Sequence, residues 1–212
     1  MVANRRGRGQ GVRVREVTRA RLLETAEAMF LAGGYAETSL DAIAHAAGYT
    51  TGAVYSNFGG KADLFLAVLE STTALELAAV REQLAAAATD DQRLRVFTAT
   101  IVAEPDRWRA RVAATIEFIG EARHQPALLE RIRAAQAEAD AVIGAILVAL
   151  SRALDIVPRD DMTAATRDVT ALLNGYAIRS LYDDSFDLAG AVAGAIKSLM
   201  VGHRAELVGS SR

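Results

Sequence analysis

Apolar residues recur every three to four positions along most of this chain, and this spacing gathers them on one face of an α-helix. The first segment of this kind, residues 14–32, predicts a helix that Gly33 and Gly34 end, with Tyr35 packed into the core behind it. Further segments with helical spacing occupy residues 61–84, 92–102, 106–122, 126–154, 160–182 and 186–203. No segment alternates apolar and polar residues as a half-buried strand does, so the pattern predicts an all-α fold of about nine helices.

Two short helices joined by a tight turn are predicted between the first helix and the longer ones. Thr38 is placed to cap the first short helix, and Asp41 three residues later completes a capping box. Gly48 follows the last apolar position, where a left-handed residue ends a helix and glycine adopts that conformation without a Cβ clash. Thr50 or Thr51 then caps the second short helix. Its exposed N-terminal end carries small and hydrogen-bonding residues, and such an end can enter the major groove of DNA.

The segment from Thr18 to Leu69 resembles the N-terminal domain of the tetracycline-repressor family of bacterial transcriptional regulators. The resemblance is carried by the run TRARLLETAEAMFLAGGYAETSLDAIAHAAG, by YSNF at the end of the second short helix, and by GGKADLF at the start of the next helix. It implies a helix-turn-helix DNA-binding domain of three helices over residues 1–60. A helical domain for effector binding and dimerisation then occupies residues 61–212.

The resemblance also implies a set of DNA contacts. Family positions that touch phosphates or groove edges are matched by Ser39, Thr50, Tyr55, Asn57 and Lys61. The N-terminal turn of the recognition helix is matched by Thr51, Gly52 and Ala53, with Ser56 one turn further on. Arg13 and Arg15 are placed to reach the DNA backbone from the start of the first helix. Because Asn57 is the only Arg, Gln or Asn at the reading end, we expect few bidentate base contacts and an affinity that comes mostly from phosphates.

Charge is distributed unevenly along the chain. The net charge of −2 by itself argues against general affinity for nucleic acid, but residues 1–21 hold seven arginines and one acid, Glu16. These residues carry +6, so the remainder carries −8. A basic end on an acidic body is expected if only one end meets phosphate. Residues 1–11 lack helical periodicity and predict a flexible arm along the DNA, with a solubilising tail as the alternative.

The last two predicted helices carry more apolar and small residues than one buried face needs. Small side chains that would let another helix approach closely are Gly190, Ala191, Ala193, Gly194 and Ala195. Two copies packed about a twofold axis would bury these faces, and the alternative is packing within one subunit. The resemblance implies the dimer, since family members pair through their two closing helices. A dimer places two recognition helices about 34–36 Å apart, on successive major grooves.

The apolar stripes of the larger domain predict a second core that holds an effector. Candidates for lining this site are Trp108, Glu117, Phe118, Glu121, His124, Asn174 and Tyr176. A mostly apolar site with a few polar groups is typical for a small molecule. Each residue also has an ordinary structural interpretation, because Trp108 suits the core and Glu117 and Glu121 suit a solvated face.

Other classes of function lack support in the sequence. The chain has no cysteine, and its three histidines are scattered without metal-ligand spacing, so we expect no metal, no cofactor and no enzyme activity. The most apolar run, residues 141–150, is too short to span a bilayer, and no signal peptide is evident. We therefore expect a cytoplasmic protein that does not bind membranes.

These patterns together predict a homodimeric transcriptional repressor. It would bind a palindromic operator in double-stranded DNA and be released by a small, largely apolar effector. The alternatives are an architectural DNA binder driven by the arginine arm, a helical carrier of apolar ligands without operator specificity, and a repressor that responds to no ligand. The identities of the ligand, the operator and the regulated genes are not encoded in these patterns, nor is repression as opposed to activation.

Overall fold

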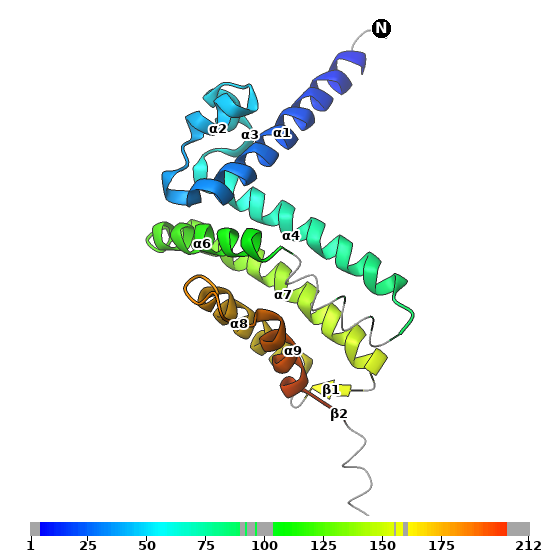
Figure 1. Cartoon of the computed structure of the whole chain (residues 1–212). Helices are drawn as coiled ribbons and strands as arrows, with labels where there is room; N and C mark the ends of the chain where they lie inside the picture. Colours follow the sequence, from blue (N-terminus) through cyan, green and yellow to red (C-terminus); the bar gives the residue numbers. More distant parts are fainter. Residues whose placement is uncertain are drawn as a thin grey trace, which may run out of the picture. The chain divides into compact units, whose positions relative to one another are not determined.

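A computed structural model describes residues 5–89, 92, 96, 104–154, 156–158 and 161–202. Within these ranges the chain forms eight helices and two short strands (Figure 1). In chain order they are α1 (Arg5–Glu37), α2 (Leu40–Ala47), α3 (Thr51–Phe58), α4 (Lys61–Ala86), α6 (Pro105–Ala122), α7 (Pro126–Leu154), β1 (Ile156–Pro158), α8 (Met162–Arg179), α9 (Leu188–Leu199) and β2 (Met200–Gly202). The all-α prediction is confirmed. The helix predicted at 92–102 falls mostly outside the described residues.

The chain divides into two compact units. One contains the residues up to Thr72 together with Ala113–Leu129, and the other contains Thr73–Val112 and the residues from Glu130 onward. The helices α4, α6 and α7 therefore each contribute residues to both units. The division of function after residue 60 stays a prediction. None of the helices in the described ranges has the length and apolar character that a bilayer crossing requires.

Helix α1 is longer at both ends than its apolar pattern predicts. It begins at Arg5, so the arm predicted over residues 1–11 is helical from that residue onward. Arginine favours helix, and a helix nucleated by the residues that follow can extend through glycines that would not sustain one alone. At the other end the helix passes Gly33 and kinks at Gly34, where φ is 76° and ψ is 173°. A side chain rarely adopts this backbone conformation, which explains the glycine at this position.

The helices α1, α2 and α3 pack on one another around a small core. Side chains that are fully or almost fully buried in this unit include Leu22, Ala26, Phe30, Tyr35, Ile43, Val54, Leu64 and Phe65. The rings of Phe30 and Tyr35 each lie 5.0–5.9 Å from a neighbouring ring of the same cluster, which includes Phe65. The prediction that Tyr35 belongs to the core is confirmed, because 1% of the residue is exposed.

The N-terminal cap of α2 is one residue later than predicted. Ser39 is the cap, and its hydroxyl accepts a hydrogen bond from the backbone N–H of Ala42 at 3.1 Å. The capping role predicted for Thr38 is wrong, because its hydroxyl donates to the carbonyl of Gly34 at 2.7 Å. That carbonyl lies at the kink of α1. The hydroxyl of Thr38 therefore bonds to the preceding helix instead of capping α2. The prediction for Gly48 is confirmed, since it ends α2 with φ 81° and ψ 25°.

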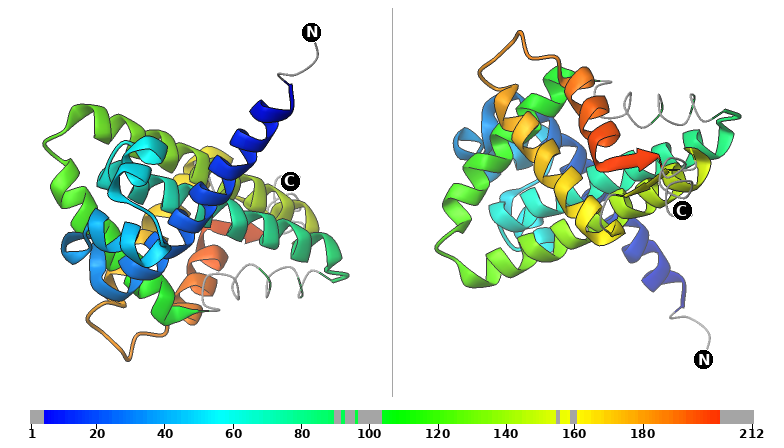
Figure 2. Two further views of the ribbon diagram at one scale, coloured as in Figure 1. Left: turned by 90° about the horizontal axis from the view of Figure 1, so that it is seen from above. Right: turned by 90° about the horizontal axis from the view of Figure 1, so that it is seen from below.

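In the second unit α8 and α9 lie side by side, as the views of Figure 2 also show. Ala165, Val169 and Ala177 of α8 and Val192 of α9 are buried. The strands β1 and β2 pair antiparallel, with Val157 opposite Val201. The sequence predicted no strands, and strands of three residues are too short to show an alternating pattern.

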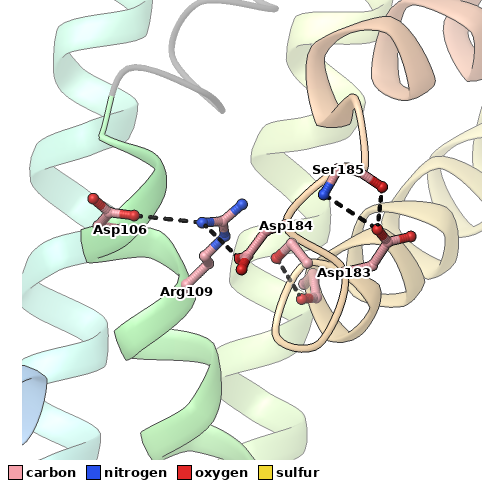
Figure 3. A network of polar contacts seen from close by, with 7 residues as sticks. Asp106, Arg109, Asp183, Asp184 and Ser185 are labelled. Carbon is pink, nitrogen blue, oxygen red and sulfur yellow. Dashed lines mark hydrogen bonds and ion pairs between the residues drawn. The ribbon is translucent and has the colours of Figure 1, made fainter.

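The loop between α8 and α9 is held by charged groups (Figure 3). The guanidinium of Arg109 on α6 lies 3.5 Å from a carboxylate oxygen of Asp106 and 3.7 Å from one of Asp184. Asp183 accepts hydrogen bonds from Ser185 and from Arg179. These bonds, first that from Ser185 and then that from Arg179, hold the pKa of the Asp183 carboxyl below its ordinary value.

Candidate nucleic-acid interface

The predicted recognition helix is α3, which has only eight residues. Thr50 is its N-terminal cap residue but makes no side-chain capping bond, and Gly59 ends the helix with φ 91°. Val54 is fully buried and anchors the helix to the core of the first unit. A helix this short is marginal in water by itself, so its position depends on the tertiary contacts at its two ends.

The N-terminal end of α3 is tied to α2. The hydroxyl of Thr51 donates a hydrogen bond to a carboxylate oxygen of Asp41 in the first turn of α2. Asp41 therefore helps to join the two helices rather than completing the capping box predicted with Thr38. The hydroxyl proton of Thr51 is used in this bond, so its hydroxyl oxygen remains as an acceptor and its methyl group remains for contact with a base.

The outer face of α3 carries most of the predicted DNA contacts. Gly52, Tyr55 and Ser56 are exposed, with 57% of Tyr55 accessible to solvent. Ala53 and Asn57 are half-buried. The side-chain amide of Asn57 donates to the carbonyl of Ala53 at 2.7 Å, so the one group suited to bidentate base contact is turned toward its own helix. This orientation is consistent with the expectation of little direct base readout.

The predicted phosphate-binding cations differ in their surroundings. Arg13 is exposed. The guanidinium of Arg15 donates to the carbonyl of Ser56 at 3.1 Å, at the C-terminal end of α3. The ammonium of Lys61 donates to the carbonyl of Ala36 at 2.9 Å and lies 4.4 Å from the centre of the Tyr35 ring. Lys61 therefore has a structural role within this unit, and two of its three N–H groups remain for a phosphate.

Four of the predicted effector residues belong to the first unit. The carboxylate of Glu117 accepts from the backbone N–H of Ala36 at 2.8 Å, and Glu121 accepts from the hydroxyl of Tyr35 at 3.3 Å. Phe118 is 1% exposed, and its ring lies 5.1 Å from that of Tyr35 and 4.9 Å from that of Phe65. His124 is exposed in the turn before α7 and accepts from the side chain of Arg123.

The other three predicted effector residues belong to the second unit. Trp108 and Tyr176 are half-buried, and Asn174 is exposed. The ring of Tyr176 lies 5.6 Å from that of Phe186 in the loop before α9. The roles in effector binding given to all seven residues stay predictions.

Burial and charge both act on Tyr35. Burial, followed by the neighbouring carboxylate of Glu121, raises the pKa of the Tyr35 phenol well above its ordinary value. The shift favours the neutral phenol, which is the form that donates to Glu121. Residues 113–122 of α6 thus pack into the first unit through one aromatic ring and two carboxylates.

The predicted dimer face combines open glycines with exposed apolar side chains. A Cβ atom added at Gly175 of α8 or at Gly194 of α9 would meet no atom within 4 Å. Ile178, Leu181 and Tyr182, at the end of α8 and just beyond it, are exposed to 37–76%. Among the residues that the structure describes, no group of His, Asp or Glu side chains could hold a metal ion.

Two features of this region were not predicted from the sequence. One is Arg19, whose guanidinium donates to the carbonyl of Asn57 at 3.1 Å, and the other is the bond between Thr51 and Asp41. The spacing of Arg15 and Arg19, four residues apart on one helix face, was the available signal. It could not indicate α3 as the partner, because that requires the packing of α1 on α3.

Both the N-terminal and the C-terminal part of the chain match known protein families. Residues 22–68 match the family described as "Bacterial regulatory proteins, tetR family", and residues 90–199 match "BetI-type transcriptional repressor, C-terminal". Among curated proteins, the HTH-type transcriptional regulator SrpR of Pseudomonas putida is 46% identical over 56 residues, and the HTH-type transcriptional regulator TtgR of the same species is 48% identical over 54 residues. Each match covers 26% of this chain and 26% of the relative, so the chain spans about a quarter of the length of these relatives.

Solved structures resemble the chain over most of its length. A putative transcriptional regulator from Rhodococcus sp. RHA1 superposes with a TM-score of 0.72 at 18% identity, covering 86% of this chain and 95% of that one. The fatty acid degradation regulator FadR from Bacillus halodurans gives a TM-score of 0.67 at 17% identity, covering 88% and 96%. At these identities the likeness extends to the fold alone.

Proposed function

We propose that this chain, which belongs to the tetR family of bacterial regulatory proteins, is a homodimeric repressor that binds a palindromic operator and leaves it when a small, largely apolar ligand binds. The family consists of transcriptional regulators, so the chain is a DNA-binding regulator and not an enzyme. The observation that carries the proposal is the exposed outer face of α3, with Gly52, Tyr55 and Ser56 accessible on a helix held at both ends. Such a regulator works in the cytoplasm, where the bacterial chromosome lies.

Operator binding depends on phosphates more than on base edges in this proposal. The amide of Asn57 faces its own helix, while Tyr55 and Ser56 face outward. Ser39, Thr50, Tyr55, Lys61, Arg13 and Arg15 supply the phosphate and groove-edge contacts. Thr51, Gly52 and Ala53 allow close approach and methyl contact to thymine. With about six to ten phosphate contacts per dimer, affinity falls by about three to five powers of ten between 50 and 200 mM salt.

Dimerisation through α8 and α9 brings two such helices to successive major grooves. Gly175 and Gly194 leave open space on these helices, and Ile178 and Tyr182 leave exposed apolar surface beside them. A partner helix would fill the space and cover the surface, as a symmetric interface requires.

Release by a ligand requires that binding in the second unit changes the first. We assign the coupling to α6, because it is one helix that carries Trp108 in the second unit and Phe118 in the first. The ligand contacts Trp108, Asn174 and Tyr176, and the movement reaches the first unit through Glu117, Phe118 and Glu121. The coupling free energy equals the difference in ligand affinity between the two states, typically about 1–3 kcal/mol.

Fluorescence anisotropy with labelled DNA from upstream of the gene tests the proposal. The duplex is titrated with protein at several salt concentrations beside a scrambled duplex of equal length. We expect selective binding to the upstream duplex and a steep dependence on salt. Equal affinity for the two duplexes at every salt concentration would contradict operator binding and would favour the architectural alternative. Deleting residues 1–11 then abolishes most binding by an architectural protein and only part of the binding by a repressor.

A further inference from the structure

The C-terminal end of α3 leaves backbone carbonyls without partners in the helix itself. The last four carbonyls of any α-helix lack an intrahelical donor. In α3 the carbonyl of Tyr55 accepts from the backbone N–H of Gly59 at 3.0 Å, after which the chain turns away. The next two carbonyls, those of Ser56 and Asn57, are satisfied by side chains that come from α1.

Both donors are arginines on one face of α1. Arg15 donates to the carbonyl of Ser56, and Arg19, one helical turn later, donates to the carbonyl of Asn57, each at 3.1 Å. The guanidinium carbon of Arg19 also lies 4.3 Å from the centre of the Phe58 ring, within the range of a cation–π contact. Arg19 therefore holds the last turn of α3 by a hydrogen bond and by a ring face at once.

The charge of these arginines suits the end that they contact. The C-terminus of a helix carries partial negative charge, and α3 has no basic residue of its own in the last turn. Its N-terminal cap residue, Thr50, makes no side-chain capping bond. The two arginines therefore bring to the C-terminal end of α3 the positive charge that the helix itself lacks there, while the bond between Thr51 and Asp41 holds the N-terminal end.

We propose that Arg19 is a positioning residue for DNA recognition, which fixes the axis of α3 through the carbonyl of Asn57 and the ring of Phe58. Arg15 makes the neighbouring contact to Ser56. In this role Arg19 acts on the operator through α3, and it does not bind a phosphate. The consequence for operator binding rests on the proposed function, while the consequence for the order of α3 does not.

The DNA test compares two arginines of α1. Arg19→Met removes the charge and the donors but keeps an unbranched side chain, and Arg21→Met is the matched control, since Arg21 pairs with Glu24 on its own helix. We expect Arg19→Met to weaken operator binding by about 5- to 30-fold relative to Arg21→Met, from the combined contributions of a helix-end cation and a cation–π contact. Affinity for unrelated DNA should be the same in both variants. Arg19→Lys, which keeps a cation near the carbonyl, should restore part of the loss.

A phosphate contact would give a different result. It would lower the affinity of Arg19→Met for operator and unrelated DNA alike, and would reduce the salt slope by about 0.9 for each protomer. That outcome, or an operator affinity equal to that of the control, would overturn the proposal.

Hydrogen exchange of the protein without DNA separates this proposal from the proposed function. In Arg19→Met the amides of Asn57, Phe58 and Gly59 should exchange about 5- to 30-fold faster than in Arg21→Met, while those of α2 stay unchanged. Unchanged exchange at the end of α3 would overturn the positioning role even if operator binding is observed. Faster exchange there together with no selective DNA binding by the unmodified protein would instead count against the proposed function.

Discussion

The carboxylate of Glu117 accepts a hydrogen bond from the backbone N–H of Ala36 at 2.8 Å, although 81 residues separate the two along the chain. The bond exists because α1 kinks at Gly34, which frees the N–H groups that follow from the regular helical pattern. The same carboxylate lies 2.9 Å from the position that a Cβ atom on Gly34 would occupy. The kink thus provides both the N–H group that the Glu117 carboxylate binds and the space beside Gly34 that the carboxylate occupies. The bond between Glu117 and Ala36 attaches the C-terminal part of α6 to α1 within the first unit.

Replacing Gly34 with alanine should destabilise the protein. The residue has φ 76°, which a side chain tolerates poorly, and the added Cβ would press on the Glu117 carboxylate. We expect a loss of about 1–3 kcal/mol in the free energy of unfolding, measured by urea denaturation. Gly120→Ala is the control, because its Cβ would meet no atom within 4 Å in the last turn of α6, and it should be neutral or slightly stabilising. Equal effects of the two substitutions would contradict the strain assigned to Gly34.

The stability of the protein at high pH should depend on Tyr35. Burial and the carboxylate of Glu121 raise the pKa of its phenol above the ordinary value, so the folded state favours the neutral form. A group with a raised folded pKa contributes stability that is complete below the unfolded pKa, near 10, and is lost as the pH rises above it. Denaturation between pH 8 and 12 should show this loss in the unmodified protein but not in Tyr35→Phe.

Two control measurements test whether deprotonation of Tyr35 causes the loss of stability at high pH. Tyr182→Phe removes a phenol that is 76% exposed and should retain the full loss of stability at high pH. At pH 7 Tyr35→Phe should cost about 1 kcal/mol, the usual net value of one hydrogen bond. If Tyr35→Phe follows the same pH curve as the unmodified protein, deprotonation elsewhere explains the loss.

Tyr55 should matter for DNA and not for folding. Its side chain is more than half exposed on the outer face of α3, so Tyr55→Ala removes little buried surface. We expect operator affinity to fall about tenfold, the value of one good groove or phosphate contact, with the melting temperature unchanged. Lys61→Ala makes a useful contrast, because Lys61 also binds the carbonyl of Ala36, so this variant should lose both affinity and some stability. Full operator affinity in Tyr55→Ala would mean that α3 does not face the groove as proposed.

A large side chain at Gly194 should break the proposed dimer without unfolding the protomer. A Cβ at this position meets no atom within 4 Å in the single chain, so the substitution Gly194→Leu begins in open space, and we expect its clash to come from an approaching partner helix. Overpacking costs about 1–3 kcal/mol per site, and the twofold axis applies it twice, which raises the dimer dissociation constant by at least about tenfold. Sedimentation velocity of Gly194→Leu and of Gly120→Leu, which adds the same side chain to α6, measures the change. An unaltered dimer in Gly194→Leu would place the interface elsewhere.

Signals that are local in sequence were sufficient for much of the fold. Gly48 had to end α2 because only glycine enters the left-handed region without cost, and Pro105 and Pro126 begin α6 and α7, where a missing N–H does no harm. Tyr35, which follows the two glycines, was predicted to belong to the core, and it is buried. The family motif and these signals together predicted a short helix after Gly48, and the structure has α3 there.

Only the tertiary structure determined which side chains pack together and which groups form hydrogen bonds. Periodicity shows that a face is buried but not what covers it, so Phe118 was assigned to the second core although it packs against Tyr35 and Phe65. Ser39 rather than Thr38 caps α2 because the kink at Gly34 offers Thr38 a carbonyl. Arg15 and Arg19 reach α3 only because α1 and α3 pack together. A residue's own neighbours in sequence determine its conformation and its tendency to be buried, whereas hydrogen-bond and ring partners depend on contacts between segments that are distant along the chain.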